Sequence, residues 1–175
     1  PTIVSRCELI HLRPLSLEKV NQGLQNLWDI PPDQAHLLAH LSNGRPGYAL
    51  RLYQNPEILE QRETVINDHQ FLLTASRVER FNYAENLVKD KAMLFQSLGI
   101  WLTLWRDVML RVSGSSVPMI NLDRQADIAQ ISNQVDLLTA QEMLKILEKT
   151  QTRLNHYTNT RLTAEVLMLN LPQLE

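Results

Sequence analysis

The chain has 175 residues, of which 44% are hydrophobic and 21% are charged, and its formal net charge is −2. This composition excludes global disorder, and the absence of a positive excess disfavours a stand-alone nucleic-acid binder, whose affinity depends on phosphate contacts. The single cysteine excludes an internal disulfide framework and a cysteine-rich zinc site. A cytoplasmic location without a membrane span is expected, since the most apolar stretch, residues 98–105, is too short to cross a bilayer.

Residues 2–12 have the only convincing strand character, because Thr2, Ile3 and Val4 are followed by alternating apolar residues. A single strand cannot stand alone, so its partner strands are expected upstream of this sequence. Pro1 is not the residue of a native start codon. The sequence is therefore interpreted as a fragment that begins at the edge of another domain.

Three short helices are expected between residues 14 and 55. Ser16 is suited to cap the first helix, in which apolar residues recur at helical spacing from residue 17 to residue 28. Two prolines at residues 31 and 32 begin the second helix, and Gly44 is suited to the left-handed position that follows its end. The third helix begins at Pro46. Such a small bundle buries little surface and is expected to be stabilised by packing against a neighbouring domain.

Longer helices are expected beyond Pro56, at residues 58–73, 78–88, 93–112, 123–135 and 159–169, and one more from Thr139. Thr139 and Glu142 have the spacing of a capping box. The helix at 93–112 is apolar almost all round, which predicts a place at the centre of a bundle. One of its faces is formed by Phe95, Leu98, Leu102, Trp105 and Met109.

The candidate metal-binding, base-stacking and nucleophilic residues are each better explained by a structural role. His36 and His40 are four residues apart on one predicted helix, but no third metal ligand accompanies them. Trp101 and Trp105 are expected in the core rather than as a stacking platform, and Cys7 is expected to be a small buried hydrophobic residue. The sequence contains no GxxxxGK[ST] motif for binding phosphates.

Arg6, at the end of the predicted strand, has two interpretations. It is either an ordinary surface arginine or an arginine that a rigid strand end presents to an anionic partner. The guanidinium group is permanently charged, and its forked donors fit phosphate oxygens. The residues alone leave both interpretations open.

Three segments of the sequence resemble the AAA+ clamp-loader family. "PTIVSRCELIHLRPLS" (1–16) is similar to the end of the ATPase domain, where a Ser-Arg-Cys triplet follows the strand of the sensor-1 region. "LLAHLSNGRPGYALRL" (37–52) resembles the lid with its sensor-2 helix, and "NTRLTAEVLMLNLP" (159–172) resembles the closing helix of the collar domain. In order and spacing these segments cover the chain from end to end. Within the family, the similarity is greatest to the delta-prime type of the bacterial DNA polymerase III clamp loader.

The resemblance implies a role for Arg6. Ser5, Arg6 and Cys7 match the family triplet, whose arginine acts in trans as an arginine finger on ATP bound by the neighbouring subunit. Such a cation can accelerate phosphoryl transfer by about 10³–10⁵. Gly47 stands where the motor subunits carry the sensor-2 arginine, and Arg45 lies two residues earlier. The resemblance therefore implies that ATP and Mg²⁺ are bound by the neighbouring subunit, with no cofactor or metal in this chain.

The resemblance also implies the domain organisation. Residues 1–13 correspond to the end of the ATPase domain, residues 14–55 to the lid that contains Gly44 and Gly47, and residues 56–175 to the collar, which joins the subunits into a ring. The predicted fold class is all-α, with a three-helix lid, a larger helical collar and a short remnant strand. The implied partners are other clamp-loader subunits and, through the assembly, the sliding clamp and primer-template DNA.

Two alternatives accompany this hypothesis. The chain could belong to an ATP-hydrolysing gamma/tau-type subunit whose P-loop lies upstream, although Gly47 disfavours this. It could also be a helical protein-interaction module that is unrelated to any ATPase. The chain itself is not expected to be an enzyme, whereas the assembly that it resembles is an ATP-driven loader within the DNA polymerase III holoenzyme.

Overall fold

The structure, a computed structural model, describes residues 6–8, 12–156 and 159–174. Within these ranges the chain is all-helical, with nine α-helices, one short 3-10 helix and no β-strand, which confirms the predicted all-α class. Contacts between Cα atoms divide the chain into two compact units, Pro1–Tyr53 and Gln54–Glu175. The boundaries proposed at residues 13 and 55 remain predictions.

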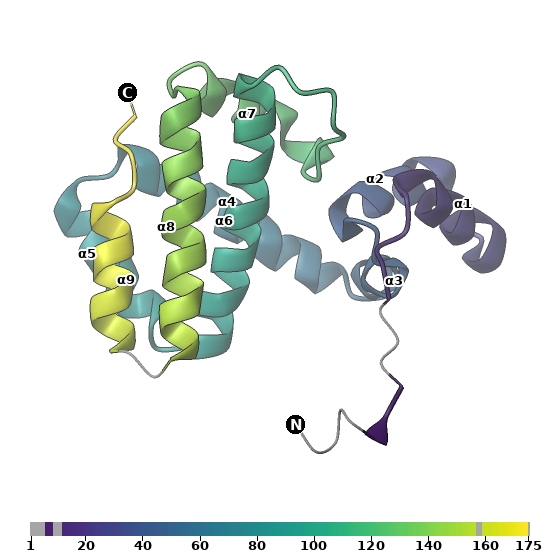
Figure 1. The fold of residues 1–175 in the computed structure, drawn as a ribbon, viewed down its shortest axis with the longest axis horizontal. Coiled ribbons are helices and arrows are strands. Elements are labelled where there is room, and N and C mark those ends of the chain that lie inside the picture. The colour runs from purple at the N-terminus through teal and green to yellow at the C-terminus, as the bar shows by residue number, and fades with distance from the viewer. Residues whose placement is uncertain (1–5, 9–11, 157–158, 175) are drawn as a thin grey trace. The chain divides into compact units, whose positions relative to one another are not determined.

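The first unit contains α1 (Leu17–Trp28), α2 (Pro32–Ser42) and α3 (Pro46–Gln54), shown in purple and blue in Figure 1. The hydroxyl of Ser16 accepts a hydrogen bond from the amide of Lys19 at 3.4 Å, which confirms Ser16 as the N-cap of α1. Helices α1 and α2 pack directly against each other. Their small shared core includes Val20, Leu24 and Leu38.

The strand expected at residues 2–12 lies mostly outside the described residues. Its four described residues, Arg6, Cys7, Glu8 and Leu12, have 3-10, bend or irregular backbone rather than strand geometry. Cys7 is exposed, so the prediction that it is a buried hydrophobic residue is wrong. Its apolar sequence neighbours suggested burial, but the packing that would bury it is not present among the described residues.

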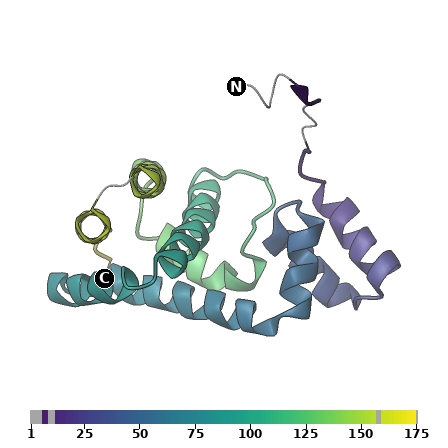
Figure 2. The ribbon, with the colours of Figure 1, turned by 90° about the horizontal axis from the view of Figure 1, so that it is seen from below.

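The second unit holds the remaining helices. They are α4 (Pro56–Thr74), α5 (Arg77–Leu87), α6 (Lys91–Val112), the 3-10 helix η2 (Leu122–Arg124), α7 (Gln125–Ser132), α8 (Leu137–Asn155) and α9 (Thr160–Leu169). Helix α6 packs against α4, α5, α7 and α8, and α9 packs against α5 and α8. Figures 1 and 2 together show α4 running crosswise to α8 and α9. The prediction of one continuous helix at 123–135 is wrong, since η2 and the shorter α7 occupy this stretch.

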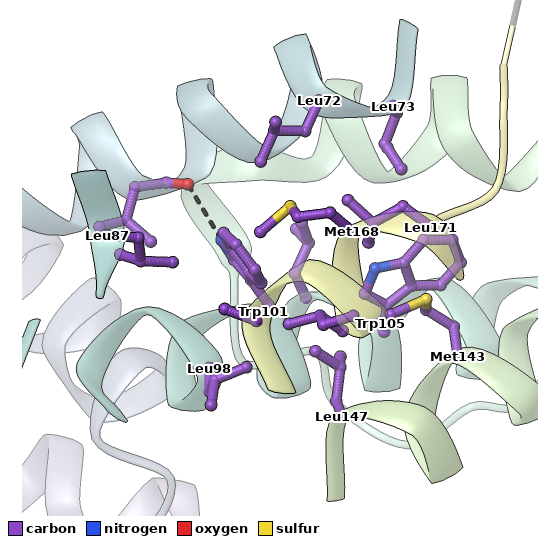
Figure 3. Close-up of a cluster of buried hydrophobic side chains, with 14 of the residues drawn as sticks. Leu72, Leu73, Leu87, Leu98, Trp101, Trp105, Met143, Leu147, Met168 and Leu171 are labelled. Atoms are coloured by element: carbon purple, nitrogen blue, oxygen red, sulfur yellow. Dashed lines mark hydrogen bonds between the residues drawn. The ribbon is translucent and has the colours of Figure 1, made fainter. Parts of the chain in front are cut away.

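Helix α6 lies at the centre of the second unit, as its apolar sequence predicted. Trp101 and Trp105 are fully buried and lie among leucine and methionine side chains from several helices (Figure 3). The face named from the sequence is not the most buried one, however, because Phe95, Leu102 and Met109 are only partly buried. The fully buried positions of α6 follow a neighbouring stripe and include Leu94, Leu98, Trp101, Leu104, Trp105 and Val108.

Local capping differs from the predicted pattern at α8. Its N-cap is Asp136, whose carboxylate accepts a hydrogen bond from the amide of Thr139 at 2.8 Å. Thr139 is therefore inside the helix, and the predicted Thr139–Glu142 capping box is wrong. A complete capping box is found instead at α5, where Ser76 and Glu79 each bond the other's backbone amide. An aspartate three residues before the threonine is the stronger cap, because its ionised carboxylate also interacts favourably with the helix dipole.

A buried arginine joins the carboxyl ends of two helices in the second unit. Arg80 of α5 is only 5% exposed and has no acidic partner among the described residues. Its guanidinium group donates to the backbone carbonyls of Leu72, Leu73, Met168, Leu171 and Pro172 and to the side chain of Gln173, at 2.8–3.3 Å. The carbonyls of Leu72, Leu73 and Met168 lie in the last turns of α4 and α9, where helical carbonyls lack intrahelical partners, and the other two follow α9. Arg80 therefore satisfies both helix ends at once and also holds the C-terminal tail.

A second polar network fixes the segment between α6 and η2. The buried Asp107 carboxylate accepts hydrogen bonds from the backbone amides of Ile120 and Asn121 and from the Asn121 side chain. The side-chain carbonyl of Asn121 accepts from Arg62 of α4, which also pairs with Asp123 at 2.6 Å. Each buried charge thus has a partner, and the connection is tied to both α4 and α6.

His69 on α4 lies beside the two core tryptophans. Its Nε2 accepts a hydrogen bond from the indole of Trp105 at 2.7 Å, and its ring stacks on Trp101. Complete burial, with a smaller contribution from the charge of Arg80, lowers the pKa of His69 to about 3. The imidazole is therefore neutral at physiological pH and acts as an acceptor in the core rather than as an acid or base.

Candidate functional site

The N-terminal motif residues are placed only in part. Ser5 lies outside the described residues, while Arg6 and Cys7 are both exposed. Among the described residues, Arg6 has no ion-pair or hydrogen-bond partner. A guanidinium group binds phosphate oxygens well.

Gly44 lies in the turn between α2 and α3, which it allows to approach the start of α1. Its φ is +77°, and a Cβ atom at this position would lie 2.5 Å from the carbonyl oxygen of Leu15 and 2.8 Å from Cβ of Pro14. The amide of Leu15 donates a hydrogen bond to the carbonyl of Gly44 at 2.8 Å. The predicted left-handed position is confirmed, and the glycine is needed both for its φ and for this close approach.

We expect Gly44→Ala to destabilise the first unit by about 2–3 kcal/mol, because left-handed strain adds to a backbone clash. Hydrogen–deuterium exchange of the amides in α1, α2 and α3 measures this effect separately from the second unit. Gly47→Ala is the matched control, since nothing lies within 4 Å of a Cβ atom there. Equal exchange rates in the two variants would contradict the structural role of Gly44.

Gly47 is the second residue of α3 and is exposed. The space around it is open, so its lack of a side chain is not required by packing. Arg45, two residues earlier, bonds the carbonyl of Ser42 through Nε at 2.9 Å, and its guanidinium carbon lies 5.0 Å from the ring centre of Tyr48. Arg45 is thus held against the α2–α3 turn.

The two histidines of α2 form no metal site with other described residues. The rings of His36 and His40 meet edge to face with centres 4.8 Å apart. No group of three potential metal ligands occurs in the described part of the chain. Likewise, within that part, no helix has the length and apolarity that crossing a membrane requires.

The second unit exposes large apolar side chains on α5 and α9, which pack against each other. Val78 and Phe81 are exposed on α5, and Leu162 and Leu169 are exposed on α9. Scattered apolar residues are normal on a surface, but several on one pair of helices are typical of protein–protein contacts. We call these four residues the α5/α9 apolar residues.

Most of the second unit has a known counterpart. Residues 56–173 match the protein-family model described as DNA polymerase III, delta subunit, C terminal. The chain belongs to this family. No curated protein matches the chain in a sequence comparison. The match spans α4 to α9 and most of the tail held by Arg80, so the clamp-loader resemblance extends over the whole described helical unit.

Membership of this family assigns a clamp-loader-related role in DNA replication and implies interaction with other loader subunits. The match does not reach Arg6, Gly44 or Gly47, which lie before residue 56. The roles of these three residues therefore rest on the motifs and on their local geometry.

Proposed function

We propose that this chain is the lid and collar of a delta-prime-type clamp-loader subunit, which supports the ring through its collar and supplies Arg6 in trans to a neighbouring ATPase site. The observation that carries the proposal is the combination of the Ser5-Arg6-Cys7 triplet with glycine at position 47. The triplet belongs to a subunit that contacts a neighbour's nucleotide. Glycine at the sensor-2 position belongs to a subunit that does not hydrolyse ATP itself.

The surroundings of Gly47 support this division of roles. A Cβ atom would meet no steric obstacle there, since nothing lies within 4 Å of it. Local packing therefore does not require glycine at this position. With glycine, the position has no side chain that could bind a phosphate group. ATP and Mg²⁺ are held by the neighbouring subunit in this proposal, and this chain catalyses no reaction alone. The same glycine disfavours the gamma/tau-type alternative.

The collar contacts other loader subunits through the α5/α9 apolar residues in this proposal. Val78 is 68% and Leu162 is 57% exposed, so each loses water contact when a partner covers it. The sliding clamp and primer-template DNA are reached through the assembled ring rather than by this chain alone. A net charge of −2 agrees with such an indirect role. The assembly acts in the cytoplasm.

We expect the chain to co-elute with the other clamp-loader subunits in gel filtration, and the double variant Val78→Lys/Leu162→Lys to elute separately. Two unpaired lysines in an apolar interface weaken association by about a hundredfold or more. Gln141→Lys, at an exposed position on α8, is the matched control and retains co-elution. Failure of the unmodified chain to co-elute would overturn the loader proposal, whereas co-elution of the double variant would move the interface elsewhere.

A further inference from the structure

A surface pocket in the second unit is lined by none of the α5/α9 apolar residues. It has a volume of about 280 Å³, and its wall is mainly apolar. Helices α4, α5 and α6 all contribute side chains to it, among them Val65, Asp68, Tyr83, Leu87, Met93 and Ser97. We call it the Ser97 pocket. Mainly apolar pockets with a few convergent polar groups are the usual form of ligand sites.

Ser97 gives the pocket an unused hydrogen-bonding group. The residue is fully buried, and its hydroxyl has no hydrogen-bond partner in the structure. Buried hydroxyl groups are normally paired, because an unpaired one loses its bonds to water without replacement. An occupant of the pocket that carries a hydrogen-bonding group would remove this deficit.

Asp68 gives the pocket its charge. Its only hydrogen bond to a described residue comes from the Tyr83 hydroxyl at 3.1 Å, which leaves most of the acceptor sites of the carboxylate open. Burial, followed by the charge and hydrogen bond of Asp68, raises the pKa of Tyr83. Tyr83 is therefore a neutral donor, and it does not neutralise the Asp68 carboxylate.

None of the residues that line the pocket is cationic. The two lysines nearest in the sequence are both exposed: Lys89 donates to the side chain of Asn86 at 2.7 Å, and Nζ of Lys91 lies 5.8 Å from the ring centre of Phe95. The pocket thus combines an apolar wall with one carboxylate that lacks a cationic partner among the lining residues. This combination favours a side chain with a long aliphatic stem and a cationic end.

We infer that the Ser97 pocket binds an arginine side chain of a protein partner. The methylene stem packs against the apolar wall formed by Val65, Leu87 and Met93, and the guanidinium group pairs with Asp68. The guanidinium fork can bond both oxygens of a carboxylate while other donors remain for a hydroxyl such as that of Ser97. This inference does not depend on the clamp-loader proposal, because it rests on the lining of the pocket alone.

The test uses capped amino acids as probes of the whole chain in ¹⁵N NMR titrations. We expect N-acetyl-arginine-methylamide to shift the amides of α4, α5 and α6 around the pocket saturably, with a Kd on the order of a few millimolar. The citrulline analogue has the same shape without the charge, so its affinity is expected to be about tenfold lower. Tighter binding of N-acetyl-leucine-methylamide than of the arginine probe would overturn the inference in favour of an apolar anchor.

Two substitutions test whether the arginine probe binds at Asp68. Asp68→Asn is expected to lower the affinity for the arginine probe by about tenfold, to the level of citrulline. Asp127→Asn is the matched control, because Asp127 is also half-buried in this unit but lines a different pocket. Equal losses in the two variants, or no saturable arginine binding by the unmodified chain, would refute the site. If Asp68→Asn unfolds, the comparison of arginine with citrulline on the unmodified chain still tests whether binding depends on the charge of the probe.

Ser97→Ala separates ligand binding from packing. Removal of an unpaired buried hydroxyl is expected to raise the melting temperature of the free chain by roughly 2–4 °C. The same change is expected to weaken binding of the arginine probe several-fold. If the hydroxyl had a purely structural role, Ser97→Ala would lower the melting temperature and leave arginine binding unchanged. That result would contradict the inference.

Discussion

Replacement of Arg80 by methionine is expected to destabilise the second unit by about 4 kcal/mol, since it strips hydrogen bonds from five carbonyls that have little access to water. Methionine retains an apolar stem of similar length, so the loss comes from the donors rather than from packing. The carboxyl ends of α4 and α9 would both lose their shared partner. The tail that follows α9 then keeps two hydrogen bonds to α4, from the Leu174 amide to the Leu73 carbonyl and from the Gln173 side chain to the Thr74 carbonyl.

Tryptophan fluorescence during urea unfolding measures this loss in the second unit alone if Trp28 is first replaced by phenylalanine. The remaining tryptophans, Trp101 and Trp105, are both in the core of the second unit. Arg77→Met is the matched control, because Arg77 is exposed on the same helix, and its effect is expected within about 0.5 kcal/mol. Arg80→Lys is expected to recover less than half of the loss, since one ammonium group cannot reach both helix ends. Equal unfolding midpoints for the two methionine variants would refute this account of Arg80.

The helices could largely be predicted from the sequence because their signals are local. Apolar spacing predicted α4, α5, α6 and α9 to within a few residues, and Ser16 was identified as an N-cap. The errors also have local causes. Thr139 and Glu142 have the spacing of a capping box, but Asp136 caps the same helix three residues earlier. The composition of α6 predicted its central place, whereas its inward stripe depends on how α4 and α8 pack against it.

The polar core could not be predicted because its partners are distant in sequence. Arg80 binds carbonyls some ninety residues away, and Arg62 meets Asn121 and Asp123 about sixty residues away. An arginine on a helix gives no sequence signal that distinguishes these contacts from solvent exposure. The Ser97 pocket was missed for the same reason, since its residues come from three helices.

For the candidate site, the sequence was more informative than the structure. Arg6 was identified from a triplet motif in the sequence. The structure alone would not have identified it, because it has no ion-pair or hydrogen-bond partner among the described residues. A residue that acts on another subunit's ligand has no need of partners within its own chain. Its exposed position agrees with a role in trans.

In a reconstituted clamp loader, Arg6→Ala is expected to slow hydrolysis at the ATP site next to this subunit by about 10³-fold or more. The physical reason is that negative charge spreads over the γ-phosphate oxygens in the transition state, and a fixed guanidinium group stabilises it more than it stabilises bound ATP. Single-turnover hydrolysis in the presence of clamp and primer-template DNA measures this step. Assembly of the ring is expected to be unchanged in gel filtration, because the substitution does not alter the second unit.

Two further variants distinguish a transition-state role from a general effect of charge. Arg13→Ala removes another exposed arginine seven residues along the same segment and is expected to leave hydrolysis unchanged. Arg6→Lys keeps the charge but loses the fork, so an intermediate rate is expected. Unchanged hydrolysis in Arg6→Ala would remove the finger role and leave this subunit as a scaffold. Equal slowing by Arg13→Ala would instead show that the segment contributes only positive potential near the nucleotide, without a single positioned arginine.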